Sequence, residues 1–254
     1  MPAPHRYPQP TPIDGIHLVG LDAVGTLFQL RESLGGVYAE RARAHGLPAL
    51  EGLADLLEGR FRREFAAMPR PAYRAGDRAH NDRVDRDWWR VLVQRVFAGL
   101  GPMDFEAFFE DVYARFADAA VWQVYPEVPE ALAALRRADL RLAIISNFDV
   151  RLTAVCAGLD LLPAVDAVLI AAEAGAAKPE PGIFHSAIRR FGVRPEQAVH
   201  VGDSWRDDVE GARAAGLTAV HLQRPGEEAP GERPPGVPVI SDLSALPDLL
   251  GLQR

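Results

Sequence analysis

The order of apolar runs along the chain restricts its fold more than any other feature of the sequence. Residues 16–21 form a short apolar run, and similar runs recur only after residue 121. In that second part, predicted strands alternate with predicted helices, which is the pattern of a parallel sheet with helices on both faces. The predicted strands there are 142–145, 167–170, 198–201 and 218–222, and the predicted helices are 128–138, 151–159, 183–191, 206–215 and 243–250.

A long stretch of purely helical pattern separates the first predicted strand from the others. From residue 33 to about residue 120, apolar residues recur at helical spacing in four groups, and no segment alternates as a strand does. The simplest architecture is a Rossmann-like core interrupted after its first strand by an all-helical cap. We therefore predict an α/β fold with a disordered N-terminal arm over 1–13, a core over 14–30 and 122–254, and a cap over 31–121.

Composition and charge narrow the class of protein. The chain has 254 residues, a formal net charge of −7 and one cysteine, Cys156. A single cysteine allows no disulfide within the chain, which favours a cytoplasmic location, and no apolar run is long enough to span a bilayer. The acidic balance lacks the basic stripe of a nucleic-acid-binding protein. We predict a monomer or homodimer that acts on a small molecule, without nucleic-acid or membrane partners.

Polar side chains follow several predicted strands at the point where each strand ends. Asp22 follows the first strand, Ser146 and Asn147 follow the second, and Asp203 follows the fourth, with Asp208 five residues beyond. Ligands bind beyond the carboxyl ends of the strands in open parallel sheets, so we expect these side chains to line one site. Carboxylates are ligands that Mg²⁺ takes together with substrate phosphates. The sequence therefore predicts a site for Mg²⁺ and an anionic substrate.

A single lysine stands among the basic residues of the chain. The 28 basic residues are 27 arginines and Lys178, which lies in the loop after the predicted strand over 167–170. An ammonium is a compact point charge, whereas a guanidinium is a planar fork, so the two are not interchangeable at a tight site. We interpret Lys178 as the charge that balances the carboxylates and a phosphoryl group.

Four short motifs resemble those of the haloacid dehalogenase superfamily. They occur in the family's order across residues 16–222, and the helical stretch after the first motif is similar to the family's helical cap. One such motif is a weak signal, but four in register are specific. The motifs are residues 21–28 (LDAVGTLF), 144–147 (IISN), 178–184 (KPEPGIF) and 200–212 (HVGDSWRDDVEGA).

The resemblance implies a role for each matching residue. The first motif would supply the nucleophile, the second would hold the substrate's oxygens, the third would supply the lysine, and the fourth would hold the metal. The implied site residues are Asp22 and Lys178 for catalysis, Thr26, Ser146 and Asn147 for substrate binding, and Asp22, the backbone carbonyl of Val24, Asp203 and Asp208 for Mg²⁺.

One position departs from the pattern of the family's phosphatases. They carry a second aspartate two residues after the nucleophile, as general acid and base, and here that residue is Val24. Valine transfers no proton, and general acid–base catalysis typically contributes ~10²–10⁴ in rate. The resemblance therefore implies a hydrolase whose efficiency depends on the leaving group or on a proton donor elsewhere.

Three functions remain open on these residues. The first, which we favour, is a Mg²⁺-dependent, phosphatase-like hydrolase that acts on a small phosphorylated metabolite through an aspartyl-phosphate intermediate. The second is a 2-haloacid dehalogenase that uses Asp22 as nucleophile without metal, although Asp203 gives the fourth motif its metal-holding form. The third is a weakly active or non-catalytic binding protein, because a fold does not determine a function.

Several neighbouring residues are expected to have structural roles. His200 lies within a predicted strand and is expected to pack there rather than bind metal. Asp207 lies at a predicted helix start, where the helix dipole favours acidic residues, and is expected to face solvent. Of Trp88 and Trp89, at least one is expected in the core of the cap, because adjacent helical positions point ~100° apart.

Overall fold

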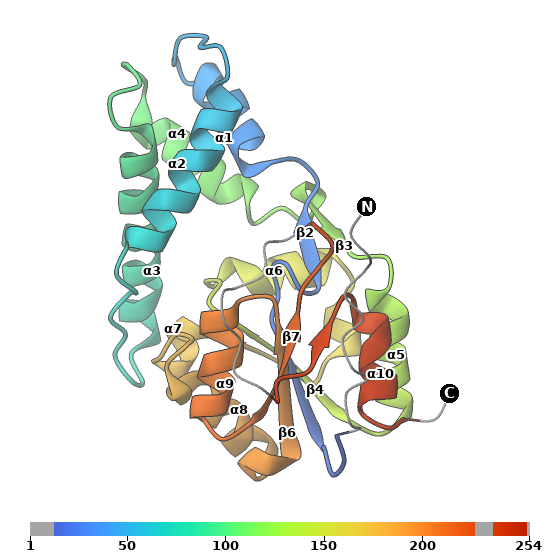
Figure 1. Cartoon of the computed structure of the whole chain (residues 1–254). Helices are drawn as coiled ribbons and strands as arrows, with labels where there is room; N and C mark the ends of the chain where they lie inside the picture. The colour runs from blue at the N-terminus through green and yellow to red at the C-terminus, as the bar shows by residue number, and fades with distance from the viewer. Residues whose placement is uncertain (1–12, 227–235, 253–254) are drawn as a thin grey trace.

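A parallel sheet forms the centre of the protein. The computed structural model describes residues 13–226 and 236–252. Within these residues, six strands pair in parallel in the order β5-β4-β1-β6-β7-β8 (Figure 1). The strands are β1 (Leu18–Leu21), β4 (Arg141–Ser146), β5 (Ala167–Ile170), β6 (Ala198–Gly202), β7 (Thr218–Leu222) and β8 (Val239–Ile240).

The first strand in sequence lies in the middle of the sheet. β1 pairs with β4 on one side and with β6 on the other, so that Leu21 lies opposite both Ile144 and Val201. All four residues of β1 are buried, as expected for a parallel strand covered on both faces. Because the three strands end at one edge of the sheet, the residues that follow them are brought together there.

Helices cover both faces of the sheet. Ile144 packs in one apolar cluster with residues of α5 and α10, whereas its neighbour Ile145 packs in another with residues of α8 and α9. Successive side chains of a strand point to opposite faces, so these two clusters are the two layers of the core. The helices are α5 (Val128–Arg137), α6 (Arg151–Gly158), α7 (Ala171–Ala174), α8 (Pro181–Phe191), α9 (Gly211–Ala214) and α10 (Leu246–Leu249).

Four helices between the first and second strands of the sheet form the helical insert, residues 34–115. Figure 1 shows the insert standing beyond the carboxyl-end edge of the sheet. The ring of Tyr38 is at its centre, with ring centroids 5.8 Å from Phe97, 6.2 Å from Phe108 and 5.7 Å from Phe116. Aromatic pairs at such distances stabilise a core beyond the area they bury. The helices are α1 (Leu34–Ala44), α2 (Leu53–Ala67), α3 (Arg78–Phe97) and α4 (Phe105–Arg115).

Local sequence explains where three of these helices begin. Ser33, Asp77 and Asp104 each precede a helix, and each side chain accepts a hydrogen bond from the backbone N–H three residues on. Such caps satisfy a donor that has no partner within the helix. They define the first residues of α1, α3 and α4.

The predicted fold class, a Rossmann-like parallel sheet with an inserted helical cap, is confirmed. The division at residues 30/31 and 121/122 stays a prediction, and the predicted arm over 1–13 lies, apart from Ile13, outside the described residues. No helix in the described part of the chain has the length and apolarity to cross a membrane.

An antiparallel pair at the junction of insert and core was not predicted. β2 (Phe28–Leu30) pairs with β3 (Trp122–Val124), and the rings of Phe28 and Trp122 meet edge to face at 5.3 Å. Both strands have only three residues, too short for a periodic pattern to register. The pair ties the two ends of the insert together beside the first motif.

The segment after β6 also differs from the predicted helix over 206–215. It begins as a wide π-helical segment, Trp205–Glu210, in which the carbonyl of Ser204 accepts from the N–H of both Asp208 and Val209. An ordinary helix, α9, continues only from Gly211. A Cβ on Gly211 would lie 2.9 Å from the Cα of Pro179, so this residue lets the segment pack against the loop that carries Lys178.

Candidate active site

The side chain of Lys178 joins two carboxylates at the carboxyl-end edge of the sheet. Its Nζ donates to Oδ1 of Asp22 at 2.5 Å and to Oδ1 of Asp208 at 2.6 Å. All three side chains are buried, and Lys178 is only 2% exposed. Burial lowers the pKa of Lys178, but the two carboxylates outweigh it and hold that pKa above its usual value. The lone lysine of the chain is therefore a buried ammonium.

Three groups hold Asp208 in place. Its Oδ1 also contacts Nε2 of His200 at 2.8 Å, and its Oδ2 accepts from the backbone N–H of Ser204 at 3.0 Å. Burial raises the pKa of Asp208, but the charge of Lys178 and the His200 hydrogen bond outweigh it and hold that pKa below its usual value. His200 is fully buried, which lowers its pKa. A neutral His200 that orients Asp208 fits the structural role expected from the sequence.

Asp22, Asp203 and Asp208 form a carboxylate cluster that fits a divalent cation. Each offers one oxygen, and these oxygens lie within 4.8 Å of one another. Burial raises the pKa of Asp22 to about 6 despite Lys178, and burial with repulsion from Asp22 and Asp208 raises that of Asp203 to about 8. A cation among these carboxylates would relieve their mutual repulsion. Carboxylate oxygens are ligands that Mg²⁺ favours. The residues present therefore fit the predicted ion.

A glycine turn brings the first motif close to Asp203. Gly25 has a φ of +87°, and a Cβ there would lie 2.6 Å from Oδ2 of Asp203. Only glycine fits both the backbone angle and the space. The preceding residue, Val24, is 37% exposed and lines the cavity. The position at which phosphatases of the family carry their second aspartate is thus apolar and open to a ligand.

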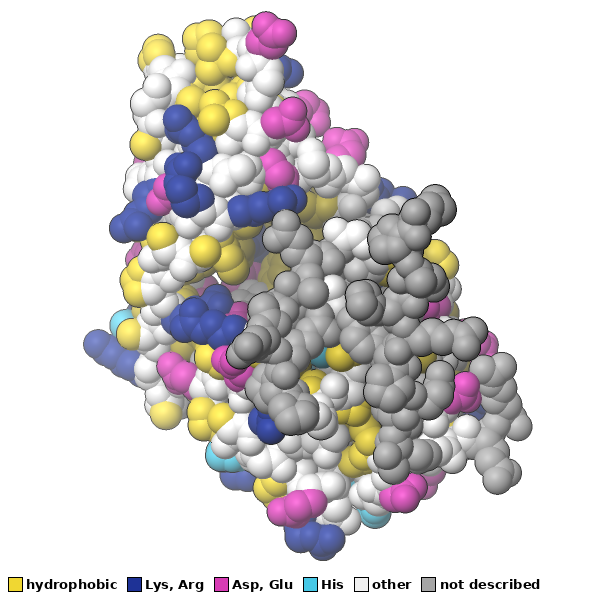
Figure 2. Space-filling model, in the orientation of Figure 1, with side chains coloured by type: hydrophobic (Ala, Val, Ile, Leu, Met, Phe, Trp, Pro, Cys, Tyr) yellow, Lys and Arg dark blue, Asp and Glu magenta, His cyan; other side chains and the backbone are white. Residues whose placement is uncertain are grey.

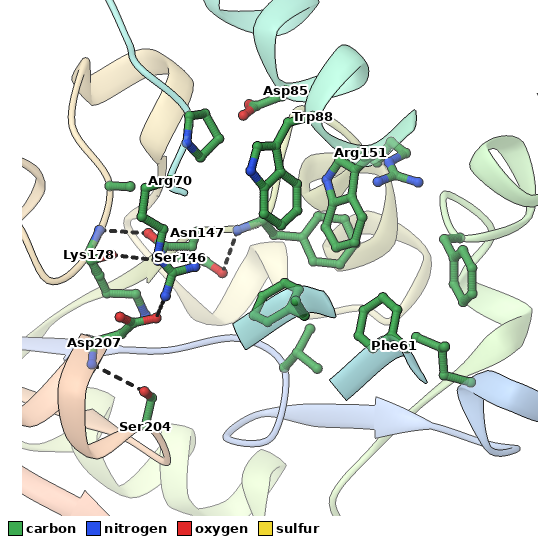
Figure 3. A pocket seen from close by; sticks show the side chains of 18 of the residues that line it. Phe61, Arg70, Asp85, Trp88, Ser146, Asn147, Arg151, Lys178, Ser204 and Asp207 are labelled. Atoms are coloured by element: carbon green, nitrogen blue, oxygen red, sulfur yellow. Dashed lines mark hydrogen bonds and ion pairs between the residues drawn. The ribbon is translucent and has the colours of Figure 1, made fainter. Parts of the chain in front are cut away.

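The second motif contacts the third through Asn147. Its Oδ1 accepts from the N–H of Lys178 at 2.7 Å, and its Nδ2 donates to the carbonyl of Lys178 at 2.9 Å (Figure 3). Ser146 lines the cavity, and its Oγ accepts from the N–H of Phe148 at 3.2 Å. Thr26 is fully buried, and its Oγ1 donates to Oδ1 of Asp203 at 3.4 Å. The structure therefore brings all the predicted site residues into one cluster, and their catalytic roles stay predictions.

A cavity of about 370 Å³ lies between the carboxylates and the helical insert. In Figure 2, a hollow between the upper and lower parts of the molecule has hydrophobic and basic side chains around it. Such a volume is typical of a small-molecule site. Both tryptophans of the Trp88–Trp89 pair contribute to its wall. The aromatic residues that line it are Tyr38, Phe61, Phe65, Tyr73, Trp88, Trp89, Phe109, Tyr113, Phe116, Trp122 and Phe148.

Asp207 does not face solvent as expected. It forms an ion pair with Arg70, which comes from the loop between α2 and α3 of the insert. Its backbone N–H donates to Oγ of Ser204 at 3.2 Å (Figure 3). The wide π-helical segment turns Asp207 toward the insert, which a sequence interpretation based on ordinary helical periodicity could not anticipate.

Besides Arg70, two further charged residues of the cavity, Asp85 and Arg151, were not predicted from the sequence. Asp85 lies on α3 and Arg151 begins α6, and both are buried. A signal for Asp85 was present in the sequence, since it lies three residues before Trp88 and seven before Leu92, which is the spacing of one helix face. For Arg151 the sequence offers no comparable signal.

The chain is an α/β protein with a cluster of buried carboxylates at the carboxyl-end edge of its parallel sheet. Comparison with known proteins identifies its family. A family model for haloacid dehalogenase-like hydrolases matches residues 16–216. Human "haloacid dehalogenase-like hydrolase domain-containing protein 3" is 38% identical over 205 residues, 80% of this chain and 80% of that protein. The chain belongs to the haloacid dehalogenase-like hydrolases, and the resemblance drawn from its four motifs is confirmed.

Two further relatives carry named activities. A phosphoserine phosphatase of Thermus thermophilus is 38% identical over 170 residues, which cover 64% of this chain and 62% of that protein. The crystal structure of a HAD phosphatase from Thermococcus onnurineus has a TM-score of 0.64 and 28% identity, and covers 94% of this chain and 100% of its own. The structural match covers nearly the whole chain and so includes both the sheet and the helical insert.

Proposed function

We propose that this hydrolase is a Mg²⁺-dependent, phosphatase-like enzyme that acts on a small phosphorylated metabolite. The observation that carries the proposal is the buried Lys178 between Asp22 and Asp208, with Asp203 beside them and a ligand-sized cavity above. The similarity to two proteins named as phosphatases supports it. The aspartates and the backbone carbonyl of Val24 would hold Mg²⁺, which would neutralise charge on the phosphoryl group.

In this mechanism, Asp22 attacks phosphorus and displaces the alcohol. Lys178 contacts Oδ1 of Asp22, so Oδ2 is the attacking oxygen. A new O–P bond forms, the ester O–P bond breaks, and water then cleaves the aspartyl phosphate to return Asp22 and inorganic phosphate. Lys178 stabilises the charge that develops on the phosphoryl oxygens, and Asp208 keeps Lys178 in position. Ser146 and Asn147 orient the phosphoryl group.

Val24 restricts the substrates that this enzyme would turn over well. The side chain of Val24 cannot protonate the departing alcohol. General acid catalysis typically contributes ~10²–10⁴ in rate. Esters with an acidic alcohol need least protonation, so their hydrolysis should be fastest. Solvent water would protonate poorer leaving groups.

A second candidate function has one observation in its favour. Displacement of halide from a 2-haloacid by Asp22 requires no proton donor for the leaving group, and the residue at position 24 is an apolar valine in a largely aromatic cavity. The crowded pair Asp22 and Asp203 argues for a cation and thus for the phosphatase. Dehalogenation that persists in chelator would favour the second candidate.

Hydrolysis of 4-nitrophenyl phosphate by the purified protein, with Mg²⁺ or with chelator, tests the proposed function. We expect turnover that requires Mg²⁺ and that falls at least ~10³-fold in Asp22→Asn, because removal of a nucleophile has effects of this size or larger. Asp87→Asn, an exposed position on α3, is the matched control. An unchanged rate in Asp22→Asn would overturn the covalent mechanism. No turnover of any phosphate ester or haloacid by the folded protein would favour a binding function.

Location and assembly also remain proposals. We infer a cytoplasmic protein, supported by its one cysteine, Cys156, which is buried and free. We infer a monomer or homodimer whose partner is its small-molecule substrate.

A further inference from the structure

A second carboxylate group lies at the insert side of the cavity, away from the nucleophile. Asp85 projects from α3 beside Trp88 (Figure 3), lines the cavity and is 5% exposed. The hydroxyl of Tyr73 donates to its Oδ1 at 2.5 Å. Its Oδ2 is buried and has no hydrogen-bond partner among the described residues. Buried polar atoms are nearly always hydrogen-bonded, so this oxygen needs an explanation.

The buried guanidinium of Arg151, which also lines the cavity, is hydrogen-bonded to another carboxylate and not to Asp85. Arg151 donates from Nε to Oδ1 of Asp149 at 2.9 Å and from Nη2 to Oδ2 at 2.6 Å. Its Nη1 donates to the carbonyl of Tyr113 at 3.0 Å. Asp149 thus has both oxygens paired, whereas Asp85 has one. This part of the protein holds two buried carboxyl groups and one buried guanidinium, and Oδ2 of Asp85 is the carboxyl oxygen left without a partner among the described residues.

The raised pKa of Asp85 agrees with the lack of a positive partner for its carboxyl group. Burial raises the pKa of Asp85 to about 7, and the charges of Asp149 and Asp82 add to the rise, while the hydrogen bond from Tyr73 and the charge of Arg151 oppose it. A positive group beside Oδ2 would remove the cost of the buried charge.

The walls around this carboxylate suit a cation. Phe61, Phe65, Trp88 and Trp89 form one connected group of rings, with Phe65 and Trp88 edge to face at 5.6 Å. Aromatic faces attract ammonium and guanidinium groups. Arg151 already uses this property, since its guanidinium carbon lies 3.7 Å from the ring centroid of Tyr113 and 5.6 Å from that of Trp89.

We propose that Asp85 and the aromatic walls beside it bind a protonated amine on the leaving group of the substrate. The substrate class is then a phosphate monoester whose alcohol has a compact apolar or aromatic body that ends in an ammonium. The ammonium pairs with the carboxylate of Asp85, the body fills the cavity, and the phosphoryl group reaches Asp22, which lines the same cavity. This inference rests on the proposed phosphatase function and adds its specificity-determining residue.

The test compares probes that differ only in the group offered to Asp85. The probes are 4-(aminomethyl)phenyl phosphate and its near-isostere 4-ethylphenyl phosphate, with 4-(hydroxymethyl)phenyl phosphate as a neutral donor. We expect Asp85→Asn to lower kcat/KM for the aminomethyl ester ~10-fold or more, and to change kcat/KM for the ethyl ester less than ~3-fold. For each ester, kcat/KM of the variant is divided by that of the wild type, and these quotients are then compared between esters. This comparison cancels the different reactivities of the leaving groups.

The Asp85→Asn variant is a clean probe, because asparagine keeps the shape and can still accept from Tyr73. Asp87→Asn, on the exposed face of the same helix, should leave all three rates unchanged. Equal effects of Asp85→Asn on the aminomethyl and ethyl esters would overturn the proposal. A loss as large for the hydroxymethyl ester as for the aminomethyl ester would overturn the choice of a cation.

Failure of the phosphatase function would be visible separately, as absence of turnover for all three esters. Binding of benzylammonium chloride, measured by calorimetry, then tests the subsite by itself. Binding that weakens ~10-fold or more in Asp85→Asn supports the amine subsite. Binding that is equal in the two proteins, or absent from both, overturns it.

Discussion

Two buried carboxylates, Asp208 at the core end of the cavity and Asp85 at its insert end, differ in the number of hydrogen bonds that they receive. At the core end, Asp208 receives hydrogen bonds from Lys178, His200 and the backbone of Ser204. At the insert end, Asp85 receives one, from Tyr73. Asp208 and Lys178 are thus held in place before any ligand arrives, whereas Asp22 and Asp203 beside them would be completed by a cation. The insert end is left incomplete, and a ligand would complete it.

Removal of Lys178 should produce the largest effect, because it would leave the core end as unpaired as the insert end. We expect Lys178→Met to lower turnover of 4-nitrophenyl phosphate at least ~10³-fold and the free energy of unfolding by about 3 kcal/mol, since two buried carboxylates lose their cation. Denaturant unfolding and steady-state kinetics measure the two effects.

Lys178→Arg separates charge from shape at the same position. It should recover part of the stability but little of the activity, because a planar guanidinium cannot replace the ammonium between Asp22 and Asp208. Full activity in this variant would contradict a requirement for a compact charge.

Restoring the second aspartate tests whether position 24 limits the rate. We expect Val24→Asp to raise kcat/KM for alkyl phosphates ~10²-fold, because their alcohols need a proton. The same change should alter hydrolysis of 4-nitrophenyl phosphate less than ~3-fold, because nitrophenolate leaves without one. Equal changes in kcat/KM for both classes of ester would show that the absence of a proton donor at position 24 does not limit the rate.

Asp85→Asn should stabilise the protein in a pH-dependent way. Because the pKa of Asp85 is raised to about 7, the folded protein keeps a proton that the unfolded chain has released between about pH 4 and pH 7. Stability therefore falls as pH rises through this window. We expect Asp85→Asn to match the wild type near pH 4 and to exceed it by about 2 kcal/mol at about pH 8. Denaturant unfolding at both pH values checks this, and a constant difference would contradict it.

The smallest effect is expected at the rim of the cavity. Arg70 and Asp207 pair across the insert and core, with side chains 27% and 15% exposed. Partly exposed ion pairs contribute little and are screened by salt. Arg70→Gln should lower the free energy of unfolding by less than about 1 kcal/mol, and less at high salt than at low salt. A loss of unfolding free energy as large as that in Lys178→Met would contradict a minor role for this ion pair.

The core end could be predicted because its residues follow directly from strand ends. Asp22, Asn147 and Asp203 are each the first residue after a parallel strand, and pairing of β1 with β4 and β6 brings them together. The order of the motifs and the lone lysine completed that prediction. The short pair β2 and β3, and the wide turn that redirects Asp207, escaped it, because three-residue strands and π-helical segments have no periodicity of their own.

The sequence by itself determined the class of fold, the family and the edge of the sheet at which the predicted site residues gather, since these follow from local periodicity and from motifs at strand ends. Only the tertiary structure decided that Asp85 is buried beside an aromatic cavity, that Arg151 pairs with Asp149 instead, and that one carboxylate oxygen of Asp85 has no hydrogen-bond partner among the described residues. The physical reason is that pairing and desolvation of a charge depend on which distant segments surround it. α3 and α6 meet there only once the insert is docked on the core.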